Sequence, residues 1–162
     1  MKEENDKSAN LREEMISELR PHFLFNSLAC ISALCRKDPA FAREGIGEFA
    51  SHLRYELDSL GRERSVAFKD ELKEIEHYLW LEKLNYGDRL RVEYDIKADC
   101  FEVTALSIQR YVEAAIKQGI AKSPTGGTIR ISSCEKNGEI TISVEEDVAG
   151  TKATAVMLKE RK

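Results

Sequence analysis

The chain has 162 residues, of which 42% are hydrophobic and 33% are charged, and its formal net charge is −4. This mildly acidic composition allows one ordinary domain or two small ones and excludes the clustered Lys and Arg of a nucleic-acid surface. The polar segment 1–10 gives no sign of a signal peptide or spanning helix, so we expect a cytoplasmic chain without direct membrane contact, which could still be the soluble part or the partner of a membrane-anchored protein. Four cysteines without a C-x-x-C pair favour small buried thiols in a reducing compartment over disulfides or a zinc site.

The first third of the chain is predicted to form two helices. Apolar residues recur at helical spacing over residues 11–35, and Pro21 is expected to interrupt this helix and bend it just before His22. Asp38 and Pro39 have the pattern of a helix start, an N-cap followed by proline at the first helical position. The connection is so short that the two helices should pack antiparallel.

A hairpin of two helices leaves too much apolar surface exposed to be stable by itself. Dimerisation into a four-helix bundle is the expected solution, and packing of the hairpin on the second half of the same chain is the alternative. We therefore expect residues 8–61 to form a dimerisation hairpin and residues 65–160 to form a second unit.

The second half mixes helices and strands. Helical spacing predicts helices over residues 68–85 and 104–117, the second ending at Gly119. Period-two alternation predicts strands over residues 90–96, 128–133, 139–144 and 151–158. Asn137-Gly138 is a strong hairpin signal. The order predicts an α+β fold, a helical hairpin followed by a reduced α/β sandwich with helices on one face of a mixed sheet.

His22 and Asn26 lie four residues apart in an apolar helical run, so they should share one face of the helix. A neutral imidazole is a nucleophile near neutral pH and, when exposed, can accept a phosphoryl group and pass it to a carboxylate. Asn26 is placed to orient the ring or to bind that group. The alternative is a partly buried core histidine. His52 and His77 have no metal-ligand spacing and are expected on solvated helix faces.

Residues 19–28, LRPHFLFNSL, resemble the phosphoacceptor box of the LytS-type sensor histidine kinases of the His_kinase family, Q-x-x-P-H-F-L-F-N-x-L. The resemblance implies that His22 is phosphorylated on a dimeric helical hairpin and that the phosphate goes to an aspartate of a response regulator. It continues through residues 49–59 and 68–90, which are similar to the second bundle helix and the linker helix. Asn85 stands where the family usually has an arginine.

The nucleotide half resembles the family less closely. Residues 107–120 are similar to the N box, P-x-x-x-Q-P-L-V-E-N-A-I-K-H-G. The family's asparagine, which helps to hold the magnesium bound to ATP, is Ala114 here, and the box histidine is Gln118. Alanine offers no oxygen to a hard cation. Glu113 and Lys117 remain with Gln118 as cofactor-binding candidates, although a Glu and a Lys on a helix are often just a solvated face.

The family motif D-N-G-x-G, whose aspartate binds the adenine amino group, corresponds to EDVAG at 146–150. Glu146 replaces that aspartate, Asp147 could substitute from the next position, valine replaces one glycine, and Gly150 survives. Residues 150–160 resemble the terminal strand G-T-x-x-x-I-x-L. The lid and second glycine-rich box that cover the phosphates are therefore expected to be missing.

Three hypotheses follow from these patterns. The first is a homodimeric phosphotransfer protein whose His22 exchanges phosphate with the receiver domain of a response regulator, with ATP and Mg²⁺ bound only if the degenerate site still works. The second is a non-catalytic interaction protein that dimerises with an intact sensor kinase or binds a regulator. The third is an active autokinase with an unusual site, which Ala114 and the missing lid disfavour.

Overall fold

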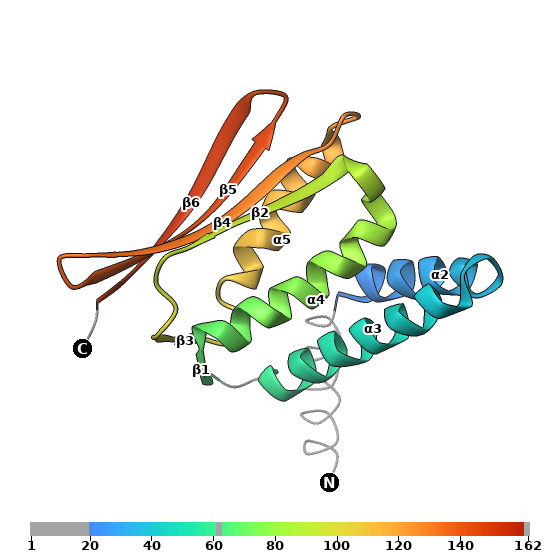
Figure 1. The fold of residues 1–162 in the computed structure, drawn as a ribbon, viewed down its shortest axis with the longest axis horizontal. Helices are drawn as coiled ribbons and strands as arrows, with labels where there is room; N and C mark the ends of the chain where they lie inside the picture. The colour runs from blue at the N-terminus through green and yellow to red at the C-terminus, as the bar shows by residue number, and fades with distance from the viewer. Residues whose placement is uncertain (1–19, 61–62, 161–162) are drawn as a thin grey trace, which may run out of the picture.

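The computed structural model describes residues 20–60 and 63–160. In this part of the chain Figure 1 shows helices α2 (Pro21–Lys37), α3 (Pro39–Ser59), α4 (Phe68–Tyr86) and α5 (Gln109–Gln118), with short 3-10 turns η1 (Gly87–Arg89) and η2 (Ile120–Lys122). The strands are β1 (Ser65–Ala67), β2 (Leu90–Ile96), β3 (Glu102–Thr104), β4 (Gly127–Lys136), β5 (Glu139–Val148) and β6 (Thr151–Glu160). The predicted α+β order of hairpin and sandwich is confirmed.

Helices α2 and α3 form the predicted antiparallel hairpin (Figure 1). Asp38 ends α2, and its Oδ1 accepts a hydrogen bond from the backbone N–H of Phe41 at 3.0 Å, which confirms the predicted cap of α3. The predicted continuous helix with a bend at Pro21 is wrong. Arg20 has a left-handed backbone (φ 49°, ψ 69°), so α2 begins at Pro21, where a missing N–H costs nothing. The rest of that prediction, residues 11–19, lies outside the described residues.

The hairpin packs on α4. Packing on the second half of the same chain was the predicted alternative to dimerisation. Phe23 and Ile31 of α2 belong to the same continuous core as Ile75 of α4. Gly45 of α3 allows this close approach, because a Cβ there would lie 3.1 Å from Ile31 and 3.2 Å from Trp80. Contact with the chain's own second half therefore accounts for one face of the hairpin.

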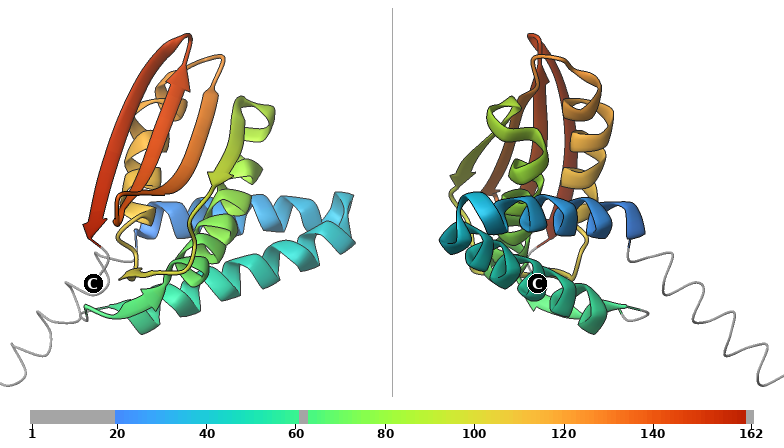
Figure 2. Two further views of the ribbon diagram at one scale, coloured as in Figure 1. Left: turned by 60° about the vertical axis from the view of Figure 1, so that its left-hand side comes forward. Right: turned by 90° about the vertical axis from the view of Figure 1, so that its right-hand side faces the viewer.

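The main sheet has the order β2-β4-β5-β6 and is mixed, with β2 parallel to β4 and the other pairs antiparallel. Helices α4 and α5 lie on one face of it and leave the opposite face uncovered (Figure 2). The inward residues of β4 and β5 are fully buried: Ile129, Ile131, Ile140, Ile142 and Val144. β1 and β3 pair in a separate small sheet that the sequence did not predict.

Both long hairpins of the sheet close in two residues. Asn137 and Gly138 have φ of 53° and 82°, as the sequence predicted for a turn between β4 and β5. Ala149 and Gly150 repeat this geometry, with φ of 52° and 80°, so β5 runs directly into β6. No described helix is both long and apolar enough to cross a membrane.

The predicted start of the helix at residue 104 is wrong, because α5 begins at Gln109. Leu106 has a positive φ of 63°, which no helix contains. The carboxylate of Glu71 on α4 accepts hydrogen bonds from the backbone N–H of Leu106 at 2.8 Å, Ile108 at 3.1 Å and Gln109 at 3.3 Å. A residue 38 positions away from the helix start thus sets where α5 begins.

Candidate functional site

His22 lies in the first turn of α2 and is exposed to solvent. The side-chain amide of Asn26 lies beside its ring, with Nδ2 at 3.3 Å from Nδ1 and 3.5 Å from Nε2. The predicted shared face is confirmed, and the alternative of a core histidine is excluded. An amide donor within reach of both ring nitrogens orients the imidazole while leaving its outer side open.

The opposite side of α2 is what holds His22 outward. Phe23, Ser27 and Ile31 recur at steps of four residues and are all buried. The ring of Phe23 lies 5.2 Å from the ring of His52 and 5.1 Å from that of Tyr78. Because this stripe is fixed in the core, His22 must face solvent.

The prediction that His52 lies on a solvated helix face is wrong, because it is fully buried. Burial, together with the nearby Arg20 and His77, lowers the pKa of His52 to about 3. Its Nδ1 is hydrogen-bonded to Glu74, whose pKa is raised to about 9, first by burial. The pair is therefore neutral near pH 7. His77 is half-buried, with Nδ1 at 2.5 Å from Glu48.

Arg20 bridges α3 and α5. It pairs with Glu56 of α3 and, through Nη1 at 2.5 Å, with Glu113 of α5. Gln109 donates from Nε2 to Glu113 at 2.9 Å. Sequence periodicity missed this bridge, since it joins residues of distant segments. Glu113, a cofactor candidate in the sequence, is thus engaged with the hairpin.

A pocket of about 190 Å³ lies between α5, β5 and β6. Its lining combines small apolar residues with a few polar ones, namely Tyr111, Ala114, Ala115, Gln118, Val144, Glu146, Ala153, Thr154 and Ala155. Burial raises the pKa of Glu146, which Lys122 partly opposes. The Oε2 atom of Glu146 is buried without a hydrogen-bond partner. The structure thus brings together Ala114, Gln118 and Glu146, three positions that sequence resemblance aligned with nucleotide-binding motifs.

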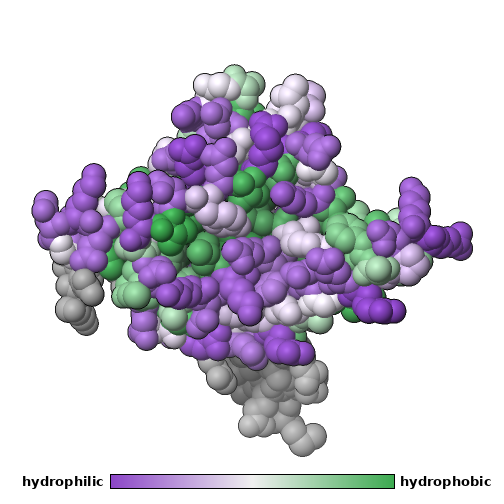
Figure 3. Space-filling model, in the orientation of Figure 1, coloured by the Kyte–Doolittle hydropathy of each residue, from purple (hydrophilic) through white to green (hydrophobic). Residues whose placement is uncertain are grey.

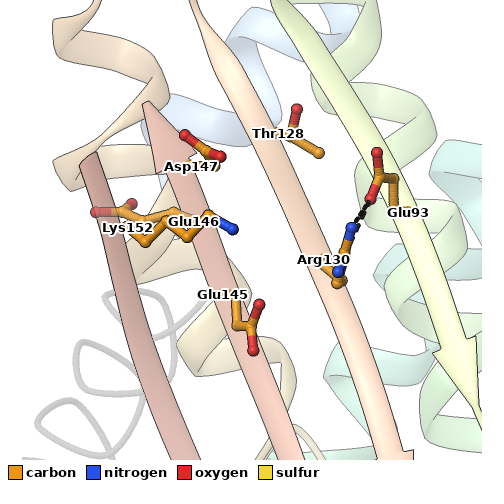
Figure 4. Close-up of a pocket in the computed structure, with 7 residues that line it drawn as sticks. All are labelled: Glu93, Thr128, Arg130, Glu145, Glu146, Asp147 and Lys152. Carbon is orange, nitrogen blue, oxygen red and sulfur yellow. Dashed lines mark hydrogen bonds and ion pairs between the residues drawn. The ribbon is translucent and has the colours of Figure 1, made fainter. Parts of the chain in front are cut away.

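The remaining candidates do not line this pocket. Lys117 is exposed on α5, and Gly150 lies in the turn between β5 and β6. Asp147 follows Glu146 on β5 and faces the uncovered side of the sheet with Thr128 and Lys152 (Figure 4), because successive strand residues point to opposite faces.

Charges on that uncovered side pair with one another. Arg130 donates to Glu93 at 2.6 Å from Nη2 (Figure 4). Within residues 20–60 and 63–160, no group of three or more His, Cys, Asp or Glu side chains could hold a metal ion.

Asn85 stands where the resembling family usually has an arginine, and it contacts α2. Its Oδ1 accepts a hydrogen bond from the thiol of Cys30 at 3.0 Å. The end of α4 is thus joined to α2 through a short polar contact. All four cysteines are free thiols, but the prediction that they are buried is wrong, because Cys35 and Cys100 are exposed.

Comparison with known proteins identifies the family of this chain. Residues 9–90 match the family model His_kinase, described as histidine kinase. YwpD of Bacillus subtilis (strain 168) is 36% identical over 136 residues, covering 83% of this chain and 49% of that protein. The sensor histidine kinase YpdA of Escherichia coli (strain K12) is 36% identical over 132 residues, 80% of this chain and 23% of that protein. This chain therefore spans about half of YwpD and about a quarter of YpdA.

One similar solved structure is the histidine kinase ThkA in complex with the response regulator protein TrrA. The superposition covers 89% of this chain and 50% of the ThkA chain, with 14% identity and a TM-score of 0.39. This likeness is too loose to carry an argument about function. The family model, by contrast, matches slightly more than half of the sequence. The chain therefore belongs to the histidine kinase family, in the kinase-core region that it shares with sensor histidine kinases such as YpdA and LytS.

Proposed function

We propose that this chain is a phosphotransfer core of a two-component system, in which His22 exchanges a phosphoryl group with an aspartate of a response regulator while the chain's own nucleotide site is defective. The observation that carries the proposal is the open His22–Asn26 pair on one face of α2. Membership of the histidine kinase family supports the chemistry and the choice of a response regulator as partner.

In the proposed transfer, one bond to phosphorus forms as another breaks, and no oxidant or reductant is needed. The lone pair of the deprotonated ring nitrogen of His22 forms an N–P bond as the P–O bond of the regulator's aspartyl phosphate breaks. The aspartate leaves as a free carboxylate with that electron pair, and the reverse step returns the phosphoryl group to it. Positioning and hydrogen bonding supply most of the catalysis in such a transfer. Asn26, whose amide has two N–H donors, would hold the ring and then a phosphoryl oxygen.

Asn26→Ala is expected to slow phosphoryl transfer at His22 by about a hundredfold, because loss of one hydrogen-bond donor to a developing charge costs about a hundredfold to a thousandfold in rate. The matched control is Ser32→Ala, an exposed polar residue on the same helix. Rates measured with a phosphorylated receiver domain should fall for the first variant alone. Equal rates for both variants and the wild type would remove Asn26 from the mechanism.

The defect in the nucleotide site is inferred from what the pocket lacks. Ala114 offers no oxygen where the family's asparagine would hold magnesium, and the residues present therefore do not fit a metal-bound nucleotide. The two-residue turn at Ala149-Gly150 leaves no segment between β5 and β6 that could cover phosphates.

Millimolar ATP with Mg²⁺ is expected to leave the melting temperature of the protein unchanged. A ligand that binds the folded state raises the melting temperature, so an unoccupied site gives no shift. Calorimetry with and without the nucleotide checks this, with the core of YpdA as the comparison protein. A clear upward shift for this chain would contradict a defective site.

The hairpin supports a homodimer. Its exposed face carries large apolar side chains, with Phe25 72%, Ile46 56% and Leu57 50% exposed. The face of α3 that packs on α4 is instead small and polar and includes the buried His52 and Glu56. Figure 3 shows one face of the molecule, on which patches of apolar surface (green) lie among polar side chains (purple). An apolar stripe left uncovered by the chain itself favours a second copy as its cover.

Light scattering of the wild type at micromolar concentration is expected to give the mass of a dimer. Ile46→Glu and Leu57→Glu should shift it to the monomer, since each places a charge in the shared apolar face. Val156→Glu is the control, because Val156 is an equally exposed apolar residue on β6, 53% exposed. A monomeric wild type would rule out the dimer.

The alternative function is a non-catalytic interaction protein that dimerises with an intact sensor kinase or binds a regulator, which the exposed apolar hairpin face also favours. The deciding experiment incubates the chain with a receiver domain labelled with radioactive acetyl phosphate. Label that moves to the wild type and is absent from His22→Ala supports phosphotransfer. Stable binding of the receiver domain, with no label transferred to the wild type or to His22→Ala, would favour the alternative.

A further inference from the structure

The start of α2 is tied to two other helices through one side chain. The carbonyl of Arg20 accepts the first hydrogen bonds of α2, from the N–H of Phe23 at 3.0 Å and of Leu24 at 3.3 Å. The guanidinium of the same residue pairs with Glu56 of α3 and Glu113 of α5. The turn that carries His22 therefore cannot move without moving this guanidinium.

Arg20 is held firmly at this point. Its guanidinium lies 5.4 Å from the ring centres of both Phe23 and Tyr78, and its side chain is only 27% exposed. A guanidinium stays charged at all ordinary pH and presents a rigid fork of donors, which suits a bridge between two carboxylates. A half-buried cation between two carboxylates strongly resists the loss of either partner.

Glu113, one of the two partners of Arg20, belongs to the helix that lines the pocket. Gln109 stands one turn before Glu113 on α5 and donates to it from Nε2 at 2.9 Å. The next residue after Glu113 is Ala114, which lines the pocket with Gln118. One helix thus carries both a partner of Arg20 and part of the pocket lining.

We propose that Arg20 is a positioning residue for phosphoryl transfer. Through Glu113 it locks the first turn of α2 to α5, so that the presentation of His22 depends on the placement of α5. The effect on phosphoryl transfer rests on the proposed function, whereas the joint between α2 and α5 rests on the contacts of Arg20 with Glu56 and Glu113. It predicts that a change on α5 loosens α2 and that a change on α2 loosens α5.

Arg20→Gln and Glu113→Gln test the joint by hydrogen exchange. Each variant is expected to speed exchange about tenfold both at the amides of Phe23 and Leu24 and at the amides of residues 113–116. The control is Arg36→Gln, an exposed arginine at the far end of α2, which should change neither set. Faster exchange confined to the helix that carries the substitution would overturn the joint.

The same variants test positioning with two phosphoryl donors. Transfer from a phosphorylated receiver domain needs an aligned His22 and should slow at least tenfold, whereas labelling by the small donor phosphoramidate needs only an open ring and should stay within twofold. Equal loss with both donors, or none, would overturn the positioning role. A wild type that neither donor labels would overturn the proposed function instead, and the exchange experiment would still decide the joint.

Discussion

Glu71→Gln is expected to lower the free energy of unfolding by about 3 kcal/mol. The substitution would leave at least two buried hydrogen-bond donors unpaired, and each costs about 1–3 kcal/mol. Glu71 is fully buried on α4. Its two oxygens accept from the hydroxyl of Tyr55 at 2.9 Å and from three backbone N–H groups at the start of α5. A glutamine keeps one of these oxygens and turns an N–H₂ group toward the donors.

Urea unfolding measures this loss, and hydrogen exchange should show that the first turn of α5 opens before the rest. The matched control is Asp70→Asn, the exposed neighbour of Glu71 on the same helix, which should change stability by less than about 0.5 kcal/mol. A Glu71→Gln variant as stable as that control would show that the start of α5 does not depend on this carboxylate.

Glu74→Gln is expected to remove a loss of stability that the wild type shows as the pH rises from about 7 to about 9. Burial, with Glu56 and Glu71 nearby, raises the pKa of Glu74 to about 9 from its usual 4.5. The folded chain therefore holds a proton that the unfolded chain has released. The stability from the protonated carboxyl is complete below about pH 4.5 and is lost as the pH passes about 9.

The stability of Glu74→Gln relative to the wild type should grow by about 1 kcal/mol per pH unit over this range, because one proton separates the two states. The glutamine amide can donate to Nδ1 of His52 and does not titrate. The titration of His52 does not change the stability between pH 7 and 9, since its lowered pKa confines its effect to the pH range between about 3 and 6.5. Unfolding curves at several pH values give the slope, with the exposed Glu76→Gln as control. Parallel slopes would show that Glu74 is ionised in the fold.

Local signals in the sequence predicted most of the elements. The Asp38-Pro39 start, the Asn137-Gly138 hairpin and the alternating strand over 90–96 were confirmed because each depends on residues close in the chain. The phosphoacceptor motif likewise located His22 and Asn26 on one exposed face. Proline geometry did not predict the left-handed backbone of Arg20, because of which α2 begins at Pro21.

Contacts between distant segments were not predictable in this way. The start of α5 depends on Glu71, and the fate of Glu113 depends on Arg20, which lies 93 positions earlier in the chain. His52 was placed on the surface because helical periodicity treats a polar residue as solvated, whereas neutral pairing with Glu74 allows its burial. The strands β1 and β3 have three residues each, too few for an alternating pattern to predict a strand.

The central claim is that an intact phosphoacceptor stands beside a failed donor site. The most direct measurement offers the wild-type chain phosphoramidate in one reaction and ATP with Mg²⁺ in another, and locates phosphohistidine by mass spectrometry. The predicted result is phosphohistidine at His22 from phosphoramidate, none in His22→Ala, and none from ATP. Phosphohistidine at His22 formed from ATP, or no modification with phosphoramidate, would contradict it.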